Sequence, residues 1–231
     1  MITRLVEPEL LDSLPADDPR AVASRRDLRV INAWMGNAGH LSAAIRKLGF
    51  PPRRVLEIGT GDGTLMLKLS RAIPAGAELW LLDLEPVVSG KTVAALRDRG
   101  YSVGIARSRI EDWVEGVKKR DFDLIIANLV LHHFSDQEIK RVFVQFSKLT
   151  RSFISCDPRR WTPALWATRA LWLLGCNDVT RHDAVISVRA GFRDSELSQL
   201  WPTESGFRLT ERPAGFSSHL FSASHQPSSP G

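Results

Sequence analysis

The stretch that decides how this chain folds is Val55-Leu56-Glu57-Ile58-Gly59-Thr60-Gly61-Asp62-Gly63-Thr64. Its first four residues form a short apolar run typical of a buried strand, three glycines follow at alternate positions, and a helical pattern begins at Thr64. Glycine permits positive φ and a close approach of ligand to backbone, and a helix N-terminus presents free N–H groups at the positive end of its dipole. The segment therefore predicts a strand–loop–helix unit that binds a ligand at the carboxyl edge of a sheet.

A second apolar run, residues 79–83, ends in Asp83, twenty residues after Gly63. A carboxylate at the end of the second strand can accept hydrogen bonds from both hydroxyls of a ribose. The loop and Asp83 together favour a ligand that contains a nucleoside over a glycine-rich turn that only makes room for packing. The glycine spacing differs from the G-x-G-x-x-G fingerprint of dinucleotide-binding proteins, which disfavours a nicotinamide dehydrogenase.

Strand and helix patterns alternate on either side of these two segments. Apolar runs predict strands at residues 55–58, 79–83, 101–106, 124–127 and 153–156. Helical patterns lie between them at residues 64–71, 87–99, 110–117 and 135–149, the last with Ser135 and Glu138 at capping-box spacing. Continuous apolar strands separated by helices indicate a mostly parallel sheet covered on both faces. Two further runs, 207–211 and 219–222, predict a hairpin and hence an antiparallel C-terminal strand. The expected fold is a Rossmann-like three-layer α/β/α sandwich with seven strands.

The remaining sequence predicts additions around this sandwich. The regions are a loosely attached acidic arm at residues 1–20, an N-terminal helical cap at 21–50, a main domain at 51–222 and a disordered tail at 223–231. Within the main domain, residues 161–183 are expected as a lid or substrate insertion after the fifth strand. Its Trp-rich helical stretch, 161–174, is followed by a loop and then by a helix near 194–201.

The glycine loop resembles the first motif of class I S-adenosylmethionine-dependent methyltransferases, an acidic residue followed by x-G-x-G-x-G, which Glu57 to Gly63 match. The run FDLIIANLVLHHF at residues 122–134 resembles the fourth strand and following turn of their small-molecule branch, which includes the ubiquinone- and menaquinone-biosynthesis methyltransferases. The resemblance is good over residues 53–157. The N-terminal helices loosely resemble those of methyltransferases that tailor polyketide or phenolic products.

This resemblance implies a set of cofactor contacts. In the family the loop packs against the methionine part of S-adenosylmethionine, the residue matching Asp83 holds the ribose hydroxyls, Leu84 flanks the adenine, and Asn128 lies at the methionine end. A Gly-Asp-Ala run common in the family is replaced here by Arg107-Ser108-Arg109. The adenine amino group would then be bound by Ser108, by a backbone group or by Asp112. The implied cofactor-binding residues are Glu57, Gly59, Thr60, Gly61, Gly63, Asp83, Leu84, Ser108, Arg109 and Asn128.

Methyl transfer to an oxygen acceptor is helped by a general base, and histidine is the usual candidate. His132 and His133 follow the fourth strand, so at least one should face the crevice, and His133 is favoured. The alternative is that His132 packs under the next helix and His133 only lines the pocket. His182, next to Asp183, is a second candidate, unless it lies in a solvated loop. The histidines show no H-x-x-x-H pattern or Cys/His cluster, so no metal is expected.

The acceptor should be bound by the variable segments. Residues 161–175 are too apolar for a fully exposed helix. Trp161 and Trp166, together with Trp34 from the cap, could line an aromatic or lipid-like cavity. The apolar segment could instead form a dimer face, touch a membrane surface or pack against the sheet.

Composition narrows the function classes. The net charge of +5 and the pI of about 9.6 raise nucleic acid as a partner. However, no basic run exceeds three residues, and the fourth strand lacks the Asn/Asp-Pro-Pro-aromatic run of base N-methyltransferases. Two cysteines, no signal-peptide core and no apolar run of membrane-spanning length predict a cytoplasmic protein.

The expected function is O-methylation of a phenolic, polyketide-like or carboxylate small molecule with S-adenosylmethionine, by a monomer or homodimer. C-methylation of a quinone-like ring, RNA methylation and a non-catalytic cofactor-binding scaffold stay open as alternatives.

Overall fold

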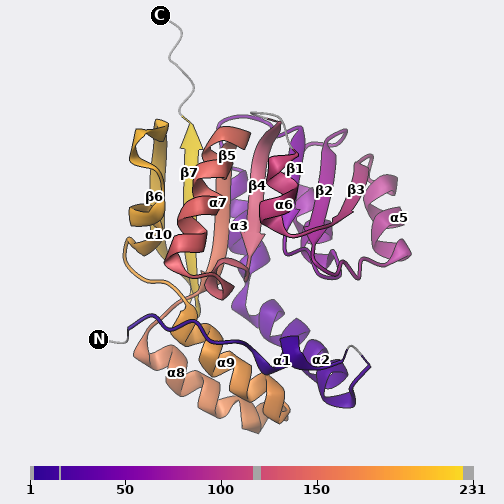
Figure 1. Cartoon of the computed structure of the whole chain (residues 1–231). Helices are drawn as coiled ribbons and strands as arrows, with labels where there is room; N and C mark the ends of the chain where they lie inside the picture. The colour runs from indigo at the N-terminus through magenta and orange to yellow at the C-terminus, as the bar shows by residue number, and fades with distance from the viewer. Residues whose placement is uncertain (1–2, 16, 117–120, 226–231) are drawn as a thin grey trace, which may run out of the picture.

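A single seven-stranded sheet forms the centre of the computed structural model, which describes residues 3–15, 17–116 and 121–225 (Figure 1). The strands are β1 (Arg54–Ile58), β2 (Glu78–Asp83), β3 (Ser102–Arg107), β4 (Phe122–Asn128), β5 (Thr150–Pro158), β6 (Phe207–Ala214) and β7 (Ser218–His225). Their order across the sheet is β3-β2-β1-β4-β5-β7-β6. Strands β1 to β5 are parallel, and β7 is antiparallel to both of its neighbours. The predicted mixed sheet is confirmed, but the antiparallel strand lies between β5 and β6 rather than at the sheet's end.

Ten α-helices and four short 3₁₀ helices surround the sheet in the described residues. The α-helices are α1 (Leu10–Ser13), α2 (Pro19–Met35), α3 (Asn37–Ile45), α4 (Thr64–Leu69), α5 (Gly90–Asp98), α6 (Ile110–Glu115), α7 (Asp136–Leu149), α8 (Thr162–Arg169), α9 (Asp178–Ala190) and α10 (Glu196–Leu200). The 3₁₀ helices are η1 (Ser70–Ala72), η2 (Leu131–His133), η3 (Ala170–Leu174) and η4 (Thr203–Ser205).

Each face of the sheet has its own apolar core. One core joins α6, α7 and α10 to the sheet and contains the packed rings of Phe143, Phe153 and Phe221. The other joins α3, α4 and α5 to the opposite face, with Leu41 and Met66 fully buried. Alternate residues of β1 and β4 enter opposite cores, which confirms the three-layer sandwich.

Local sequence signals set several helix ends. Ser135 and Glu138 form the predicted capping box at the start of α7. Gly36, at a φ of 70°, separates α2 from α3. Helix α5 begins at Gly90, later than its apolar pattern suggests, because the Ser89 side chain caps it by accepting the N–H of Thr92.

Four helices lie together at the carboxyl edge of the parallel strands. In Figure 1, α1, α2, α8 and α9 lie together below the sheet, on the side toward which the β4 arrow points. Helix α9 contacts α1, α2 and α8, and also η2 and β5. The segment 161–183, expected as a lid, contains α8, η3 and the first part of α9, and its role as a lid stays a prediction. No helix among the described residues is both long enough and apolar enough to cross a membrane.

Three parts of the chain differ from the sequence-based expectation. Helix α9 occupies residues expected as a loop, because its buried face carries the polar residues Thr180 and Asp183, which interrupt the apolar pattern. The arm expected as loosely attached is docked: Leu5 donates its N–H to the Arg189 carbonyl, and Asp183 accepts the N–H groups of Leu10 and Leu11. The predicted disordered tail begins too early, since β7 continues to His225. Residues 226–231 of that tail, and Val117 of the expected helix 110–117, lie outside the described residues.

Candidate functional site

The glycine loop joins β1 to α4 with three residues in the left-handed region. Gly59, Gly61 and Gly63 have φ values of 66°, 52° and 74°. A Cβ on Gly59 would come within 2.1 Å of Val130 Cγ2, so only glycine fits beneath the segment that follows β4. No described atom lies within 4 Å of a Cβ built on Gly61. The side of Gly61 from which a side chain would project is therefore open space.

Asp83 and the loop form one hydrogen-bonded unit. The N–H of Gly61 donates to Asp83 Oδ2 over 2.8 Å, and the N–H of Glu85 donates to Oδ1 over 3.1 Å. The Val87 N–H donates in turn to the Gly61 carbonyl over 3.1 Å. Both carboxylate oxygens keep a further lone pair, so Asp83 is oriented by the backbone and can still accept hydrogen bonds from a ligand.

Glu57 supports the loop from inside the protein. Its side chain is buried and accepts a hydrogen bond from Thr60 Oγ1 over 3.0 Å. Desolvation by this burial raises the pKa of Glu57 to about 8. The group is therefore protonated at neutral pH and holds Thr60, which is also buried.

The surface next to Asp83 is apolar and exposed. Leu84 and Val87 leave 58% and 66% of their surface accessible, an area suited to the flat face of a base. Ser108 donates its N–H to the Asp83 carbonyl, while its hydroxyl donates to the Arg109 carbonyl. Arg109 is exposed and pairs with Glu111 at 3.6 Å. Asp112 lies with Ser108 along a groove that also contains Trp80 and Trp113.

Asn128, the last residue of β4, is held by the helical cap. Its Oδ1 accepts a hydrogen bond from Asn37 Nδ2 over 2.9 Å, and Asn37 Oδ1 accepts one from the Ser218 hydroxyl over 2.6 Å. Leu129 follows with a φ of 56°, a conformation that a non-glycine residue rarely adopts and that is common at functional sites. Sequence reasoning missed Asn37 and Ser218. The adjacent helix break at Gly36 was the one local signal near Asn37.

His132 is buried between two carboxylates. Its Nδ1 lies 3.1 Å from Asp157 Oδ1, and its Nε2 lies 3.7 Å from Glu9 Oε1. Burial alone would lower the pKa of His132, but its contacts with Asp157 and Glu9 raise it to about 9. An imidazolium with both nitrogens engaged cannot take a proton from a substrate. The structure thus argues against His132 as the general base and places it in a structural ion triad.

Asp157, the residue before the end of β5, is completely buried. Its Oδ1 accepts the N–H groups of Val130 and His132 in addition to the His132 ring contact. Within the described residues its Oδ2 has no hydrogen-bond partner. Asp157 therefore fixes the turn after β4 as well as the histidine on it.

The ring of His133 packs against that of His132 in a tilted arrangement, with centroids 4.1 Å apart. Desolvation and the positive charge of His132 lower the pKa of His133 to about 4, although part of its ring remains exposed. It is a neutral imidazole at physiological pH and can accept a hydrogen bond. Donor atoms of Glu9, His132 and His133 all lie within 4.8 Å of one another. The His132 ring already lies between the Glu9 and Asp157 carboxylates, so we interpret Glu9, His132 and Asp157 as an ion triad against which the His133 ring packs.

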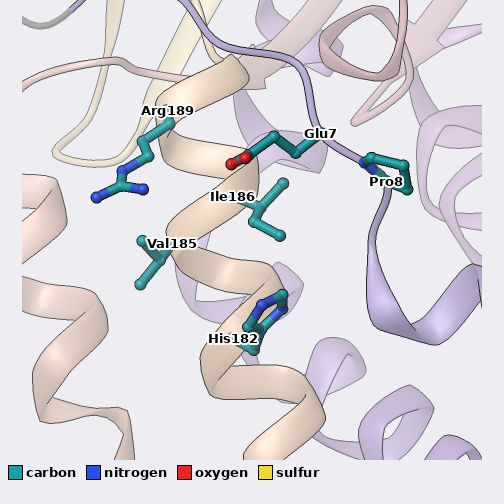
Figure 2. A pocket seen from close by; sticks show the side chains of 6 residues that line it. All are labelled: Glu7, Pro8, His182, Val185, Ile186 and Arg189. Atoms are coloured by element: carbon teal, nitrogen blue, oxygen red, sulfur yellow. The ribbon is translucent and has the colours of Figure 1, made fainter.

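His182 belongs to a different surface. It lies on α9 in an open groove of about 560 Å³ between the arm and that helix, with Glu7, Pro8, Val185, Ile186 and Arg189 (Figure 2). None of the predicted cofactor-binding residues lines this groove. The His182 Nδ1 is 3.1 Å from Asp183, which is itself bound to the backbone of α1. His182 is thus on a helix rather than in the solvated loop of the alternative.

The three candidate tryptophans divide into two sites. Trp34 at the end of α2 and Trp161 before α8 both contact the ring of Phe216, with centroids 6.3 Å and 5.0 Å away. The Trp161 Nε1 also donates to the Phe216 carbonyl over 2.9 Å. Trp166 is 63% exposed, and the guanidinium of Arg169 covers its ring. The sequence offered no signal for Phe216, which links the cap to the lid.

The residues around Asp83 fit S-adenosylmethionine. The Asp83 carboxylate matches a ribose diol, the exposed Leu84 matches an adenine face, and the open space over Gly61 leaves room for the rest of the ligand. The resemblance implies a cofactor cradle built from such features, and these residue contacts stay a prediction. Ser108 and Arg109 offer mainly backbone groups to the adenine, since the Ser108 hydroxyl is engaged and Arg109 is exposed.

Comparison with known proteins supports this interpretation. Residues 55–152 match the family model described as a methyltransferase domain. A curated relative, a probable non-canonical nonribosomal peptide synthetase, CymA, of Salinispora arenicola, is 32% identical over 100 residues. The match covers 43% of this chain and about 1% of that protein.

Solved structures show the same fold at low identity. The plantazolicin methyltransferase BamL, in complex with a triazolic desmethylPZN analog and SAH, is 18% identical with a TM-score of 0.65, covering 94% of this chain and 93% of that one. An O-methyltransferase family protein from Burkholderia thailandensis is 20% identical with a TM-score of 0.61, covering 92% and 62%. The magnesium protoporphyrin IX methyltransferase of Synechocystis PCC 6803, with bound SAH, is 17% identical with a TM-score of 0.56, covering 87% and 86%.

Proposed function

We propose that this chain is a class I S-adenosylmethionine-dependent methyltransferase that transfers a methyl group to a small-molecule acceptor, on the premise that residues 55–152 match a family model described as a methyltransferase domain. The observation that carries the proposal is the bond between Gly61 and Asp83, which ties the glycine loop to the acidic residue at the end of β2. A glycine turn that served only packing would not require the oriented Asp83 carboxylate, which lies beside the exposed Leu84 and the open space at Gly61.

S-adenosylmethionine, when bound, supplies an electrophilic methyl group. The chain's own residues bind the cofactor and orient it toward the acceptor. The loop backbone and Asp83 hold the cofactor, and Asn128 is fixed by Asn37 at the carboxyl end of β4. His133 is the candidate to accept a proton from the acceptor, because its imidazole is neutral while His132 is held between two carboxylates. Its pKa of about 4 makes it a weak base at neutral pH, so it serves best where the acceptor proton is already acidic. Alignment in a cavity that excludes water provides much of the rate enhancement.

We assign the acceptor to the phenolic, polyketide-like or carboxylate class, methylated on oxygen. A neutral imidazole helps most where the acceptor must lose a proton. The Trp34–Phe216–Trp161 cluster offers aromatic surface where the helical cap meets the lid. The curated relative is a peptide synthetase, which favours an acceptor from natural-product biosynthesis.

The experiment is a transfer assay with methyl-tritiated S-adenosylmethionine. The full chain is incubated with a panel of phenols, carboxylic acids and quinones, and calorimetry measures S-adenosylhomocysteine binding in parallel. The proposal expects binding and label on at least one phenol or carboxylic acid. Label on a ring carbon of a quinone would favour C-methylation, and binding without label on any acceptor would favour a scaffold.

RNA methylation is the alternative from a different substrate class. Only the basic pI favours it. Counterion release makes protein–RNA affinity fall steeply with salt. Adding structured RNA to the same assay therefore distinguishes the two: labelled RNA with salt-sensitive binding would replace the small-molecule proposal. Light scattering of the same sample decides between a monomer and a homodimer.

A further inference from the structure

The N-terminal arm, residues 3–13, is bound to the site at several points. Arg4 donates to the carbonyls of Ala190 and Phe134 and to the Asp136 carboxylate. Farther along the arm, Asp183 on α9 accepts two backbone N–H groups at the start of α1. The arm therefore bridges α9 and the turn that carries His132 and His133.

Glu9 lies at the centre of this bridge. The Ser187 hydroxyl donates to its Oε1, which also faces His132 Nε2 at 3.7 Å. The opposite ring nitrogen of His132 faces Asp157 Oδ1. One carboxylate from the arm and one from β5 thus hold a single imidazole from both edges. The side chains of His132, Glu9 and Asp157 are only 5%, 11% and 0% exposed, so water is excluded from the contact. Burial would raise the pKa of Glu9, but the two histidines lower it, so the carboxylate is ionised.

His133 depends on His132 for its place. The two rings are 4.1 Å apart with an interplanar angle of 35°, so a shift of the His132 ring moves the surface on which His133 rests. Among the described residues, none is hydrogen-bonded to the His133 side chain. The contact with the His132 ring is therefore the main restraint on the group assigned to accept the proton.

We propose that Glu9 is a positioning residue of the acceptor site: the docked arm holds His132 through Glu9, and His132 in turn holds the ring of His133 at the end of β4. This inference rests on the function proposed above. It makes the arm part of the site, although Glu9 lies more than a hundred residues from the histidines in the chain. Glu9 acts through His132 and touches no reacting atom.

The charged groups around the histidine pair determine how the titration of His132 should respond to replacement of Glu9. They come from the arm, β5 and α9, and comprise Arg4, Glu9, Asp12, Asp157 and Asp183. Replacing Glu9 by glutamine removes one of the two carboxylates in contact with His132 and leaves Asp157 in place. His132 should then lose its proton at a lower pH, and its ring should lose one of its two anchors.

The test is a pH titration of the full chain with carbon-13-labelled histidine, followed by NMR. The signals are assigned with His132→Gln and His133→Gln. In Glu9→Gln we expect the titration midpoint of His132 to fall by about one pH unit or more. The contact between the two rings, seen as a cross-peak in the unmodified protein, should weaken.

The matched control is Glu7→Gln. Glu7 is an exposed glutamate two residues earlier on the same arm, and its side chain points into the groove of Figure 2. This change should leave both histidines unaltered. Ser187→Ala, which removes the hydroxyl that donates to Glu9, should shift His132 in the same direction by less, and it serves as the second variant if Glu9→Gln folds poorly.

Three results overturn the proposal. Unchanged His132 and His133 signals in a folded Glu9→Gln protein mean that Glu9 positions nothing. Equal shifts in Glu7→Gln mean a general effect of charge on the arm. Tight binding of ZnCl₂ to the unmodified protein, lost in Glu9→Gln, means a metal site instead. Calorimetry with S-adenosylhomocysteine distinguishes failure of the proposed function from failure of the role given to Glu9. Glu9→Gln should bind this ligand normally. If the unmodified protein does not bind it, the result counts against the proposed function rather than against Glu9.

Discussion

The backbone N–H of Gly61, in the loop after β1, donates a 2.8 Å hydrogen bond to the carboxylate of Asp83 at the end of β2. The bond spans 22 residues of sequence and links the two features that the sequence marks for cofactor binding. Because Glu85 donates to the other carboxylate oxygen, the Asp83 side chain is held from both sides. Loop shape and ligand binding should therefore respond together when either residue is changed.

Asp83→Ala should weaken binding of S-adenosylhomocysteine by about 1.5–3 kcal/mol, the scale of hydrogen bonds to a charged group. The variant loses both the acceptor for the ribose and the anchor of Gly61. Isothermal titration calorimetry measures the change, and Asp98→Ala, an exposed aspartate at the end of α5, is the control. Unchanged affinity in Asp83→Ala would show that the ribose is bound elsewhere.

Gly59→Ala should cost more stability than Gly49→Ala. Both glycines have positive φ, at 66° and 74°, so alanine is strained by about 1–2 kcal/mol at either position. A Cβ on Gly59 also collides with Val130, whereas no described atom lies near that of Gly49. The collision should add about 1–3 kcal/mol in urea denaturation.

The collision can be tested separately with Val130→Ala. If Val130 causes the extra loss, the Gly59→Ala/Val130→Ala double variant should be more stable than the sum of the single effects predicts. Additive effects would mean that the strain at Gly59 comes from the backbone alone.

Glu57 should make the stability of the protein fall as pH rises. Its pKa is about 8 in the folded state, against an ordinary value of 4.5. Between these values the folded protein retains a proton that the unfolded chain has released, so the free energy of unfolding decreases from about pH 4.5 to pH 8. Glu57→Gln removes this titration. Its stability relative to the unmodified protein should therefore increase by about 2–4 kcal/mol between pH 5 and pH 8.

Urea denaturation at pH 5, 6.5 and 8 measures this trend. Glu204→Gln, at an exposed glutamate in η4, controls for the loss of a negative charge as such. A difference between Glu57→Gln and the unmodified protein that stays constant with pH would contradict the buried, protonated state of Glu57.

The parts of the site that the sequence predicted are those set by neighbouring residues. The loop, Asp83 and the Ser135 capping box depend on residues a few positions apart or on the regular spacing of a strand–helix unit. Partners from distant segments left no such pattern. Glu9 meets His132, and Asn37 meets Asn128, across long stretches of chain that only the folded sheet brings together.

Helix α9 shows why one element was missed altogether. A helix is read from apolar residues at regular spacing, but Thr180 and Asp183 occupy its buried face. The Thr180 hydroxyl bonds Ser24 of α2, and Asp183 bonds the backbone of α1. Because their partners lie on the helical cap, these polar residues are satisfied in the fold and look like loop residues in the sequence.

Phe216→Ala should impair use of the acceptor while leaving the cofactor bound. The ring of Phe216 contacts Trp34 on α2 and Trp161 before α8, so its loss separates the cap from the lid. Aromatic pairs contribute about 0.5–1.5 kcal/mol each beyond area burial. We therefore expect kcat/KM for the acceptor found in the transfer assay to fall by up to roughly 5- to 150-fold, the equivalent of losing both contacts. The affinity for S-adenosylhomocysteine, measured by calorimetry, should stay the same.

Trp166→Ala is the matched control for Phe216→Ala, since Trp166 is largely exposed and its ring is covered by the guanidinium of Arg169. Its removal should change neither kcat/KM nor cofactor affinity. If Trp166→Ala lowers kcat/KM and Phe216→Ala does not, the acceptor is bound along the exposed side of α8. The aromatic cluster would then be a structural joint between cap and lid.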